Sequence, residues 1–183
     1  MTDQFDRDAA RNDLLILVDG LDRQVGVATK MRAHREGLLH RAFSVVLVCD
    51  APNGCELLLS QRAEGKYHSG GLWANSCCSH PREGEPTIDA AYRRVREELG
   101  VEACELREIG SFAYRAAFGN GLVEYEYDHV LVGAYTGELR PDPAEVSATR
   151  WISADELARE LAERPEDFAA WAYTVLSMVL ATL

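Results

Sequence analysis

Short apolar runs broken by polar turns dominate the first third of the chain, and this pattern predicts strands. The segments LLILVDG (14–20) and QVGVATK (24–30) predict two short strands with a turn between them. KMRAHREG (30–37) predicts a short turn or helix. The clearest hairpin joins AFSVVLVCD (42–50) to CELLLSQR (55–62), because the intervening A-P-N-G favours a tight turn.

A helical period of about 3.6 residues then replaces the strand pattern. Apolar residues from Ile88 to Leu99 recur at spacings of three and four, and Gly100 is placed to end the helix. Thr87 is the expected N-cap. The chain therefore carries a central helix after its first strands.

The second half of the chain predicts more strands and then helices. Strands are expected at 107–116 and 122–136, with a short extended segment at 149–153. Ser153 is placed to cap a helix over 154–163. This order of elements predicts a mixed α and β domain with helices packed on a sheet.

The longest uncharged apolar run, residues 168–183, is slightly short for a membrane span and lacks basic flanks. We interpret it as a packed C-terminal helix. With 47% apolar residues and no repeat or linker, residues 13–183 are expected to form a single domain. Residues 1–12 are polar and are expected to be flexible.

Charge and cysteine content narrow the classes of partner. A net charge of −11 argues against binding to nucleic acid or to anionic lipid, and no membrane insertion is expected. An anionic substrate would therefore need a local cluster of cations or a bound metal. The acidic N-terminus lacks the order of a secretory signal, and five cysteines form an odd set, so a cytoplasmic protein with reduced thiols is expected.

The stretch NSCCSHP (75–81) places two cysteines side by side. Cys77 and Cys78 cannot bridge each other without severe strain, and in an extended segment their side chains point to opposite faces. The absence of C-x-x-C spacing disfavours a structural zinc site. One thiol is therefore expected to pack and the other to face a neighbouring site, although a single buried cysteine is more often simply a small apolar residue.

Two carboxylates stand two positions apart in VEYEYD. Glu124 and Glu126 project from the same face of a strand, where each raises the pKa of the other unless water or a cation separates them. A solvated face is the default interpretation. The apolar flanks favour instead a divalent metal held by these oxygens together with imidazoles such as those of His40 and His80.

The central helix places Arg93 and Arg94 four residues before Glu97 and Glu98. This is the weaker orientation for helical ion pairs, so it makes only a poor surface salt-bridge ladder. Residues 79–101 resemble instead the Nudix box, G-x5-E-x7-R-E-U-x-E-E-x-G-U, in which U is aliphatic. Ser79 replaces the first glycine, and Arg94 replaces a glutamate that ordinary Nudix hydrolases use to hold metal, so hydrolysis should be badly impaired.

The altered box, preceded by N-S-x-C-x-H-P, resembles the type I isopentenyl-diphosphate isomerases, a family with a Nudix fold. The resemblance runs from about Lys30 to Trp171. The matching segments are GLLHRAFS (37–44), NSCCSHP (75–81), RRVREELG (93–100), FAYR (112–115) and VEYE (123–126). It implies an α/β/α sandwich with a mixed sheet and extensions at both termini.

The resemblance also implies a site. One ion, Mn²⁺, Mg²⁺ or Zn²⁺, would be bound by His34, His40, His80, Glu124 and Glu126. A second ion, the Mg²⁺ that accompanies the substrate diphosphate, would be held by Glu98 and the backbone of Cys78. The catalytic residues implied are Cys78, Glu126, Tyr114 and Trp171. The diphosphate contacts implied are Lys30, Arg62, Lys66, Ser79 and Arg94.

The implied reaction interconverts isopentenyl and dimethylallyl diphosphate, and it feeds isoprenoid biosynthesis. A proton is added to the terminal alkene carbon and another is removed from C2, by way of a tertiary carbocation that a tryptophan face can stabilise. A monomer or weak homodimer acting on a small isoprenoid diphosphate is expected. The alternatives are a Nudix hydrolase of a diphosphate and a non-catalytic Nudix-like binding module.

Overall fold

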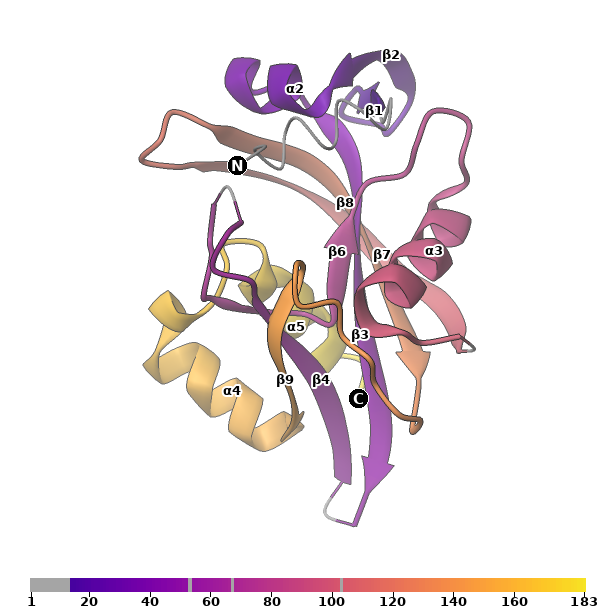
Figure 1. The fold of residues 1–183 in the computed structure, drawn as a ribbon, viewed down its shortest axis with the longest axis vertical. Helices are drawn as coiled ribbons and strands as arrows, with labels where there is room; N and C mark the ends of the chain where they lie inside the picture. Colours follow the sequence, from indigo (N-terminus) through magenta and orange to yellow (C-terminus); the bar gives the residue numbers. More distant parts are fainter. Residues whose placement is uncertain (1–13, 53, 67, 103) are drawn as a thin grey trace.

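A computed structural model describes residues 14–183 except 53, 67 and 103. The expected flexible segment, residues 1–12, lies outside the described residues. The described strands join into one mixed sheet with helices on both of its faces (Figure 1), as the sequence predicts. In the described part of the chain, no helix is both long and apolar enough to cross a membrane.

Strand β3, His40–Ala51, is the centre of the sheet. Its first nine residues pair in parallel with β8, Val123–Ala134, from His40 opposite Glu126 to Val48 opposite Ala134. On its other side β3 pairs antiparallel with β6, Cys77–Ser79, and with β4, Gly54–Arg62. Strand β6 therefore lies beside the first half of β3, at the same end of the sheet as the start of β8.

The remaining strands widen this sheet. Strand β7, Glu105–Ala117, forms a long hairpin with β8, and β9, Val146–Ser153, pairs with β4. The two-residue β5, Trp73–Ala74, also pairs with β4. Strands β1, Leu14–Val18, and β2, Gln24–Thr29, form a hairpin that meets the start of β3.

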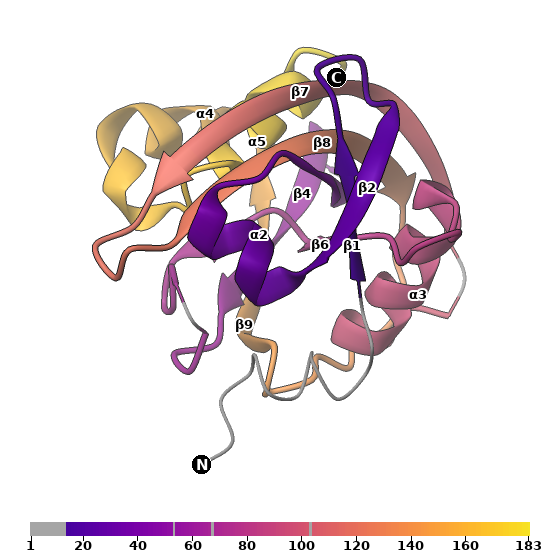
Figure 2. The same ribbon diagram turned by 90° about the horizontal axis from the view of Figure 1, so that it is seen from above.

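Helix α3, Thr87–Leu99, covers one face of the sheet, while α4, Ala154–Glu163, and α5, Ala172–Leu180, cover the other (Figures 1 and 2). Each face has its own apolar core. Phe43, Val45, Leu47 and Cys77 pack with α3, whereas Val46, Val130 and Val132 pack with α4 and α5. Alternate residues of β3 therefore enter different cores, as strand geometry requires.

The short helix α2, Lys30–Glu36, follows β2 directly, and it begins where the Thr29 hydroxyl accepts the Arg32 backbone N–H. It ends at Gly37, whose φ of 62° is a left-handed conformation that glycine adopts at little cost. This turn directs the chain from α2 into β3 within three residues. The histidines of α2 and β3 therefore lie close together.

Two expectations about helix ends differ from the structure. Thr87 is not the N-cap, because the carbonyl of Pro86 accepts the first helical hydrogen bond, from Ala90 N at 3.0 Å, and Pro86 takes the cap position. The C-terminal helix begins at Ala172, not at Phe168, because Ala169 N donates to Trp73 O at 2.9 Å and holds the preceding residues against β5. The Ser153 cap of α4 is confirmed by its acceptance of Glu156 N at 3.3 Å.

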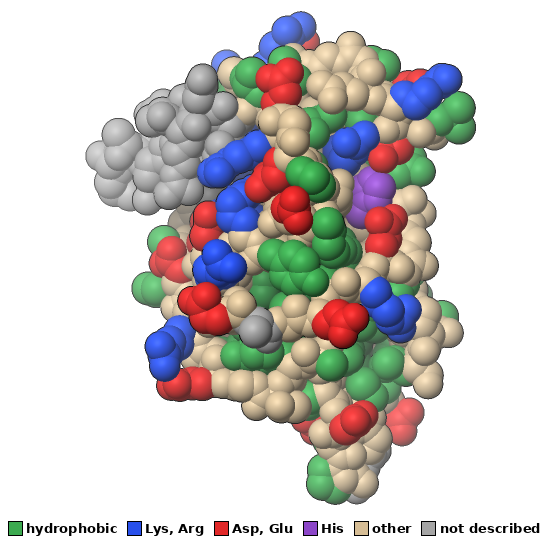
Figure 3. All heavy atoms as spheres, turned by 90° about the vertical axis from the view of Figure 1, so that its right-hand side faces the viewer, with side chains coloured by type: hydrophobic (Ala, Val, Ile, Leu, Met, Phe, Trp, Pro, Cys, Tyr) green, Lys and Arg blue, Asp and Glu red, His purple; other side chains and the backbone are tan. Residues whose placement is uncertain are grey.

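Acidic and basic side chains are interspersed on the α3 side of the molecule (Figure 3). That face shows no extended field of one sign. The net charge of −11 is therefore not gathered into one acidic patch on this face.

Candidate active site

A cavity opens where the first halves of β3 and β8 meet β6 and α3. Its lining contains most of the side chains that the sequence singles out. From the predicted catalytic and metal-binding sets these are Cys78, His80, Glu98, Tyr114, Glu124, Glu126 and Trp171. The predicted diphosphate contacts Lys30, Arg62, Lys66, Ser79 and Arg94 all line it as well.

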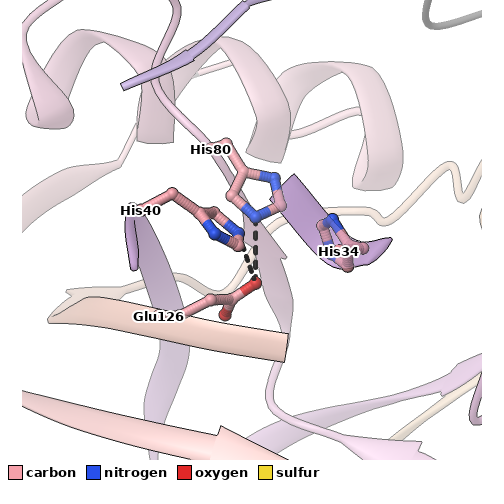
Figure 4. A group of neighbouring side chains, drawn as sticks. All are labelled: His34, His40, His80 and Glu126. Atoms are coloured by element: carbon pink, nitrogen blue, oxygen red, sulfur yellow. Dashed lines mark hydrogen bonds and ion pairs between the residues drawn. The ribbon is translucent and has the colours of Figure 1, made fainter. Parts of the chain in front are cut away.

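Three imidazoles gather beside this cavity (Figure 4); His80 lines it, whereas His34 and His40 are fully buried and do not. His34 comes from α2, His40 opens β3, and His80 follows β6, with ring centroids 5.0–6.1 Å apart. The Nδ1 atoms of His34 and His40 lie 2.8 Å from the carbonyls of Lys30 and Leu38. Because a carbonyl oxygen only accepts hydrogen bonds, both rings carry a proton on Nδ1, so Nε2 is the atom of each ring that can bind a metal.

The carboxylate of Glu126 lies beside these rings and contacts two of them (Figure 4). Its Oε1 is 2.9 Å from His80 Nε2 and 3.4 Å from His40 Nε2. One ligand atom from each of His34, His40, His80 and Glu126 lies within 4.8 Å of the others. The four side chains thus converge at the distances expected around a single ion.

The protonation states favour a cation at this point. Burial lowers the pKa of His34 to about 3 and that of His80 to about 4, so both rings are neutral near pH 7. Burial opposes ionisation of Glu126, but its contacts with His40 and His80 outweigh that effect and hold its pKa well below the usual range. A divalent metal binds neutral imidazole and ionised carboxylate, and it would take the place of the protons that otherwise lie between these groups. The donors present therefore fit a metal ion.

Glu124 lies beside this group but is turned toward a fourth histidine. Its Oε1 is 2.7 Å from Nε2 of His68, and its Oε2 accepts the Tyr114 hydroxyl at 3.1 Å. The same hydroxyl lies 2.6 Å from Glu126 Oε2. Burial, and after it the charge of Glu126, raises the pKa of Glu124 to about 8. The prediction that the two carboxylates share a face is confirmed.

Cys78 lies opposite Ser44 of β3 and faces the cavity. Burial raises the pKa of its thiol above the usual range, and the nearby Arg62 only partly offsets this effect. The thiol is therefore neutral at pH 7 and can donate a proton. Cys77 belongs to the α3 core, so the two neighbours point to opposite sides as predicted.

At the cationic end of the cavity, Arg94 and Lys66 form ion pairs with acidic side chains. Arg94 contacts Glu98 at 2.5 Å, Glu97 at 2.9 Å and Glu145 at 3.4 Å. Glu145 also forms an ion pair with Lys66. The helical ion pairs considered from the sequence do form, but the Arg94 side chain is only 14% exposed and lines the cavity, so it does not belong to a solvated surface ladder.

Trp171 immediately precedes α5 and closes another wall of the cavity. Its Nε1 donates to Asn75 Oδ1 at 3.0 Å, and the guanidinium carbon of Arg62 lies 5.0 Å from its ring centroid. The ring is buried and polar contacts fix its edge, so its face has a defined orientation.

Three contributors escape the sequence reasoning: His68, Asn75 and Glu145. Asn75 stands within NSCCSHP and could have been suspected from that stretch. His68 and Glu145 lie in polar loops without distinctive spacing, and Glu145 is 79 residues from its partner Lys66. No local pattern could have paired them.

The sequence model of the NUDIX domain family matches residues 38–172. Among solved structures, the Deinococcus radiodurans protein DR0079 is similar, with a TM-score of 0.72 and 20% identity over 90% of this chain and 98% of that one. The NUDIX domain of Shewanella oneidensis NrtR has a TM-score of 0.61 at 16% identity, over 79% of this chain and 86% of that one. These likenesses show the Nudix fold.

Relatives of closer sequence carry a more specific name. A Burkholderia multivorans protein named isopentenyl-diphosphate Delta-isomerase is 51% identical over 88% of this chain and 90% of its own length. One of the same name from Streptomyces coelicolor is 48% identical over 89% of this chain and 81% of its own length. The chain therefore belongs to the isopentenyl-diphosphate Delta-isomerase family, built on a Nudix domain.

Proposed function

We propose that this enzyme interconverts isopentenyl and dimethylallyl diphosphate by proton addition and removal, and so feeds isoprenoid biosynthesis. The observation that carries the proposal is the placement of Cys78 and Glu126 in one cavity that also contains a cluster of cations. An acid or base at one end and an anion-binding group at the other match a small apolar diphosphate. The relatives named above carry the same activity in their names.

The isomerisation moves protons without breaking the diphosphate. One group gives H⁺ to the terminal alkene carbon, and another takes a different H⁺ from C2, which restores the double bond one position along the chain. Cys78 and the Glu126–Tyr114 pair are the two proton-exchanging groups. Burial, followed by the charges of Glu126 and Glu124, raises the pKa of Tyr114 well above its usual range, so the phenol stays neutral and remains a hydrogen-bond donor.

The first ion is proposed to be Mn²⁺, Mg²⁺ or Zn²⁺. The residues proposed to hold it are His34, His40, His80, Glu124 and Glu126. When bound, such an ion lowers the pKa of nearby acidic groups and neutralises the paired carboxylates. Glu98, together with the backbone of Cys78, is proposed to hold Mg²⁺ that enters with the substrate.

The diphosphate is proposed to contact Lys30, Arg62, Lys66, Ser79 and Arg94. Arg94 and Lys66 are already oriented by Glu145, so their side chains lose little further freedom when the substrate binds. A guanidinium at position 94 can hold phosphate oxygens with two parallel hydrogen bonds.

Trp171 is proposed to stabilise the tertiary carbocation through its ring face. A desolvated cation over a tryptophan face gains about 2 kcal/mol or more. The apolar residues of α5 behind the ring help to exclude water, which would otherwise trap the cation as an alcohol.

The whole of residues 13–183 is proposed to act as one catalytic domain, in the cytoplasm, as a monomer or weak homodimer without nucleic acid. The five cysteines of the chain are unbridged in the structure, which suits a reducing compartment. Light scattering on the purified chain at several concentrations tests the oligomeric state.

The activity test uses purified protein with isopentenyl diphosphate and Mg²⁺. Dimethylallyl diphosphate should appear without release of free phosphate. Phosphate release without the isomer would favour a Nudix hydrolase, an alternative that Arg94 disfavours. If neither product appears, the result would favour a binding module. A sample stripped of metal with a chelator and then reloaded with Mn²⁺ provides the matched control.

A further inference from the structure

His68 is fixed in place by the loop that carries it, residues 63–72 between β4 and β5. Its carbonyl accepts Arg62 Nη2 at 3.3 Å. Two hydrogen bonds close the base of this loop, from Arg62 N to Leu72 O and from Gly71 N to Arg62 O, each at 2.9 Å. Gly71 has a φ of 77°, a conformation that a side chain would strain. His68 therefore occupies a defined position behind the cavity wall.

The ring of His68 lies between an aromatic pair and a carboxylate. It stacks on Phe118 with a centroid distance of 4.2 Å and meets Trp171 edge-on at 6.0 Å. Its side chain is 2% exposed, and its Nε2 lies 2.7 Å from Glu124 Oε1. Ser69 Oγ lies 3.1 Å from Nδ1 and can donate its hydroxyl proton there, which leaves the ring proton on Nε2, the atom in close contact with Glu124 Oε1.

A separate second ion at His68 is excluded by the chemistry of His34. Ligand atoms of His34, His68 and Glu124 also lie within 4.8 Å of one another, so two candidate groups share His34. Nδ1 of His34 faces the Lys30 carbonyl, which leaves one ligating nitrogen with one lone pair. One lone pair serves one ion, so the groups describe a single ion with Glu124 and His68 on its far side.

Both oxygens of Glu124 are then held by protein groups, Oε1 by His68 and Oε2 by Tyr114. We propose that His68 is a positioning residue that orients the Glu124 carboxylate for the divalent ion and ties it to the Trp171 wall of the cavity. The proposal rests on the metal role assigned above to Glu124. Groups that orient metal ligands typically change metal affinity by about 10- to 100-fold when removed.

The test measures Mn²⁺ binding by titration calorimetry on chelator-stripped protein. His68→Phe keeps the ring that stacks on Phe118 but removes the donor, and its dissociation constant should rise about 10- to 100-fold with one site retained. His68→Gln, which keeps an N–H donor, should recover part of the affinity. His129→Phe, at a histidine bound to Asp22 and Glu108 outside the cavity, should bind like the wild type.

Coupling to Glu124 separates positioning from a general structural role. If His68 acts through Glu124, the double variant His68→Phe/Glu124→Gln should bind Mn²⁺ no more weakly than Glu124→Gln alone. Additive losses, unchanged affinity in His68→Phe, or a fall from two bound ions to one would each overturn the proposal.

Turnover gives an independent readout. In His68→Phe, kcat should fall while KM for isopentenyl diphosphate changes less than twofold, because the diphosphate contacts are intact. A rise in KM with kcat unchanged would also overturn the proposal. If the wild type fails to isomerise, the function is wrong, whereas the Mn²⁺ titrations still decide the role of His68.

Discussion

The two cysteines of strand β6 project from opposite faces of the strand and have different surroundings. Cys77 enters the apolar core beneath α3, among residues such as Phe43 and Leu58. Cys78 faces the cavity that contains Glu126 and Arg62. Burial raises the pKa of both thiols, so their acidity alone does not distinguish them. Both residues line the cavity, but their neighbours differ: Cys77 packs in the α3 core with Glu98 beside its thiol, whereas the charges of Arg62 and Glu126 act on the thiol of Cys78.

Removing each thiol in turn gives the largest expected contrast. Cys78→Ala should reduce turnover by about 10²- to 10⁴-fold or more, because a proton-exchanging group is lost. Cys77→Ala should retain most of the turnover. Formation of dimethylallyl diphosphate under saturating substrate measures both, and comparable losses in the two variants would remove the distinction between the faces.

The carboxylates on the cavity face extend the comparison to metal binding. Glu124→Gln should lower the Mn²⁺ content after dialysis by roughly tenfold, because a ligand oxygen with charge is replaced by an amide. Glu108→Gln, an exposed partner of His129, is the matched control and should leave the content unchanged. Elemental analysis of the dialysed proteins measures the difference. Equal metal content in both variants would exclude Glu124 from the site.

Replacing each cysteine with serine compares the two positions through the free energy of unfolding. Cys77→Ser buries a hydroxyl in the α3 core, where Glu98 is a polar neighbour, and should lower the free energy of unfolding by about 1–3 kcal/mol. Cys78→Ser places the same group at a polar cavity and should cost less. Urea denaturation followed by tryptophan fluorescence measures both values. A larger loss for Cys78→Ser would contradict the assignment of the apolar face to Cys77.

The smallest effect concerns a carboxylate far from the cavity, which contrasts with Glu124. Hydrogen bonds from Arg150 at 2.5 and 3.1 Å hold the pKa of Glu160 below its usual value. The pair therefore stabilises the fold above the usual glutamate pKa, and the contribution disappears as the pH falls through the lowered value. Glu160→Gln should lower stability by about 1 kcal/mol at pH 7, and this difference should shrink between about pH 5 and 3.

The control for that experiment is Glu163→Gln, an exposed position of the same helix. It should be close to wild type at every pH. Thermal unfolding of the three proteins across this pH range provides the measurement. A constant difference between Glu160→Gln and wild type down to pH 3 would mean that ionisation of Glu160 is not the cause.

Local sequence signals predict the elements well because they depend on near neighbours. The helix at Ala154 is predicted from its Ser153 cap and its period, and the hairpin of β3 and β4 from its turn residues. Thr87 shows the limit of such reasoning: a good capping residue stands one position too late, because Pro86 already supplies the first acceptor. The start of α5 likewise depends on contact with β5, which the apolar run does not reveal.

The residues of the candidate site also differ in how well the sequence predicts them. Residues within recognisable motifs, such as Cys78, His80 and Arg94, are placed in the cavity as the sequence implies. His68 and Glu145 meet their partners only through the fold, and their loops carry no period or repeated spacing. Sequence reasoning therefore finds the groups proposed to contact the substrate more readily than those proposed to orient them.

The parallel pairing of β3 with β8 also means that the two strands leave the ribosome at different times during synthesis. Ser44 and Asp128, which join the two strands through a 2.8 Å hydrogen bond, are 84 residues apart. At about 5–20 residues per second, β8 leaves the ribosome about 4–17 seconds after β3. Early in that interval the nascent chain contains His34 and His40, and His80 follows before either Glu124 or Glu126 is made. The proposed ion can therefore gather its full set of ligands only after β8 has emerged, and it would then stabilise the folded domain by mass action.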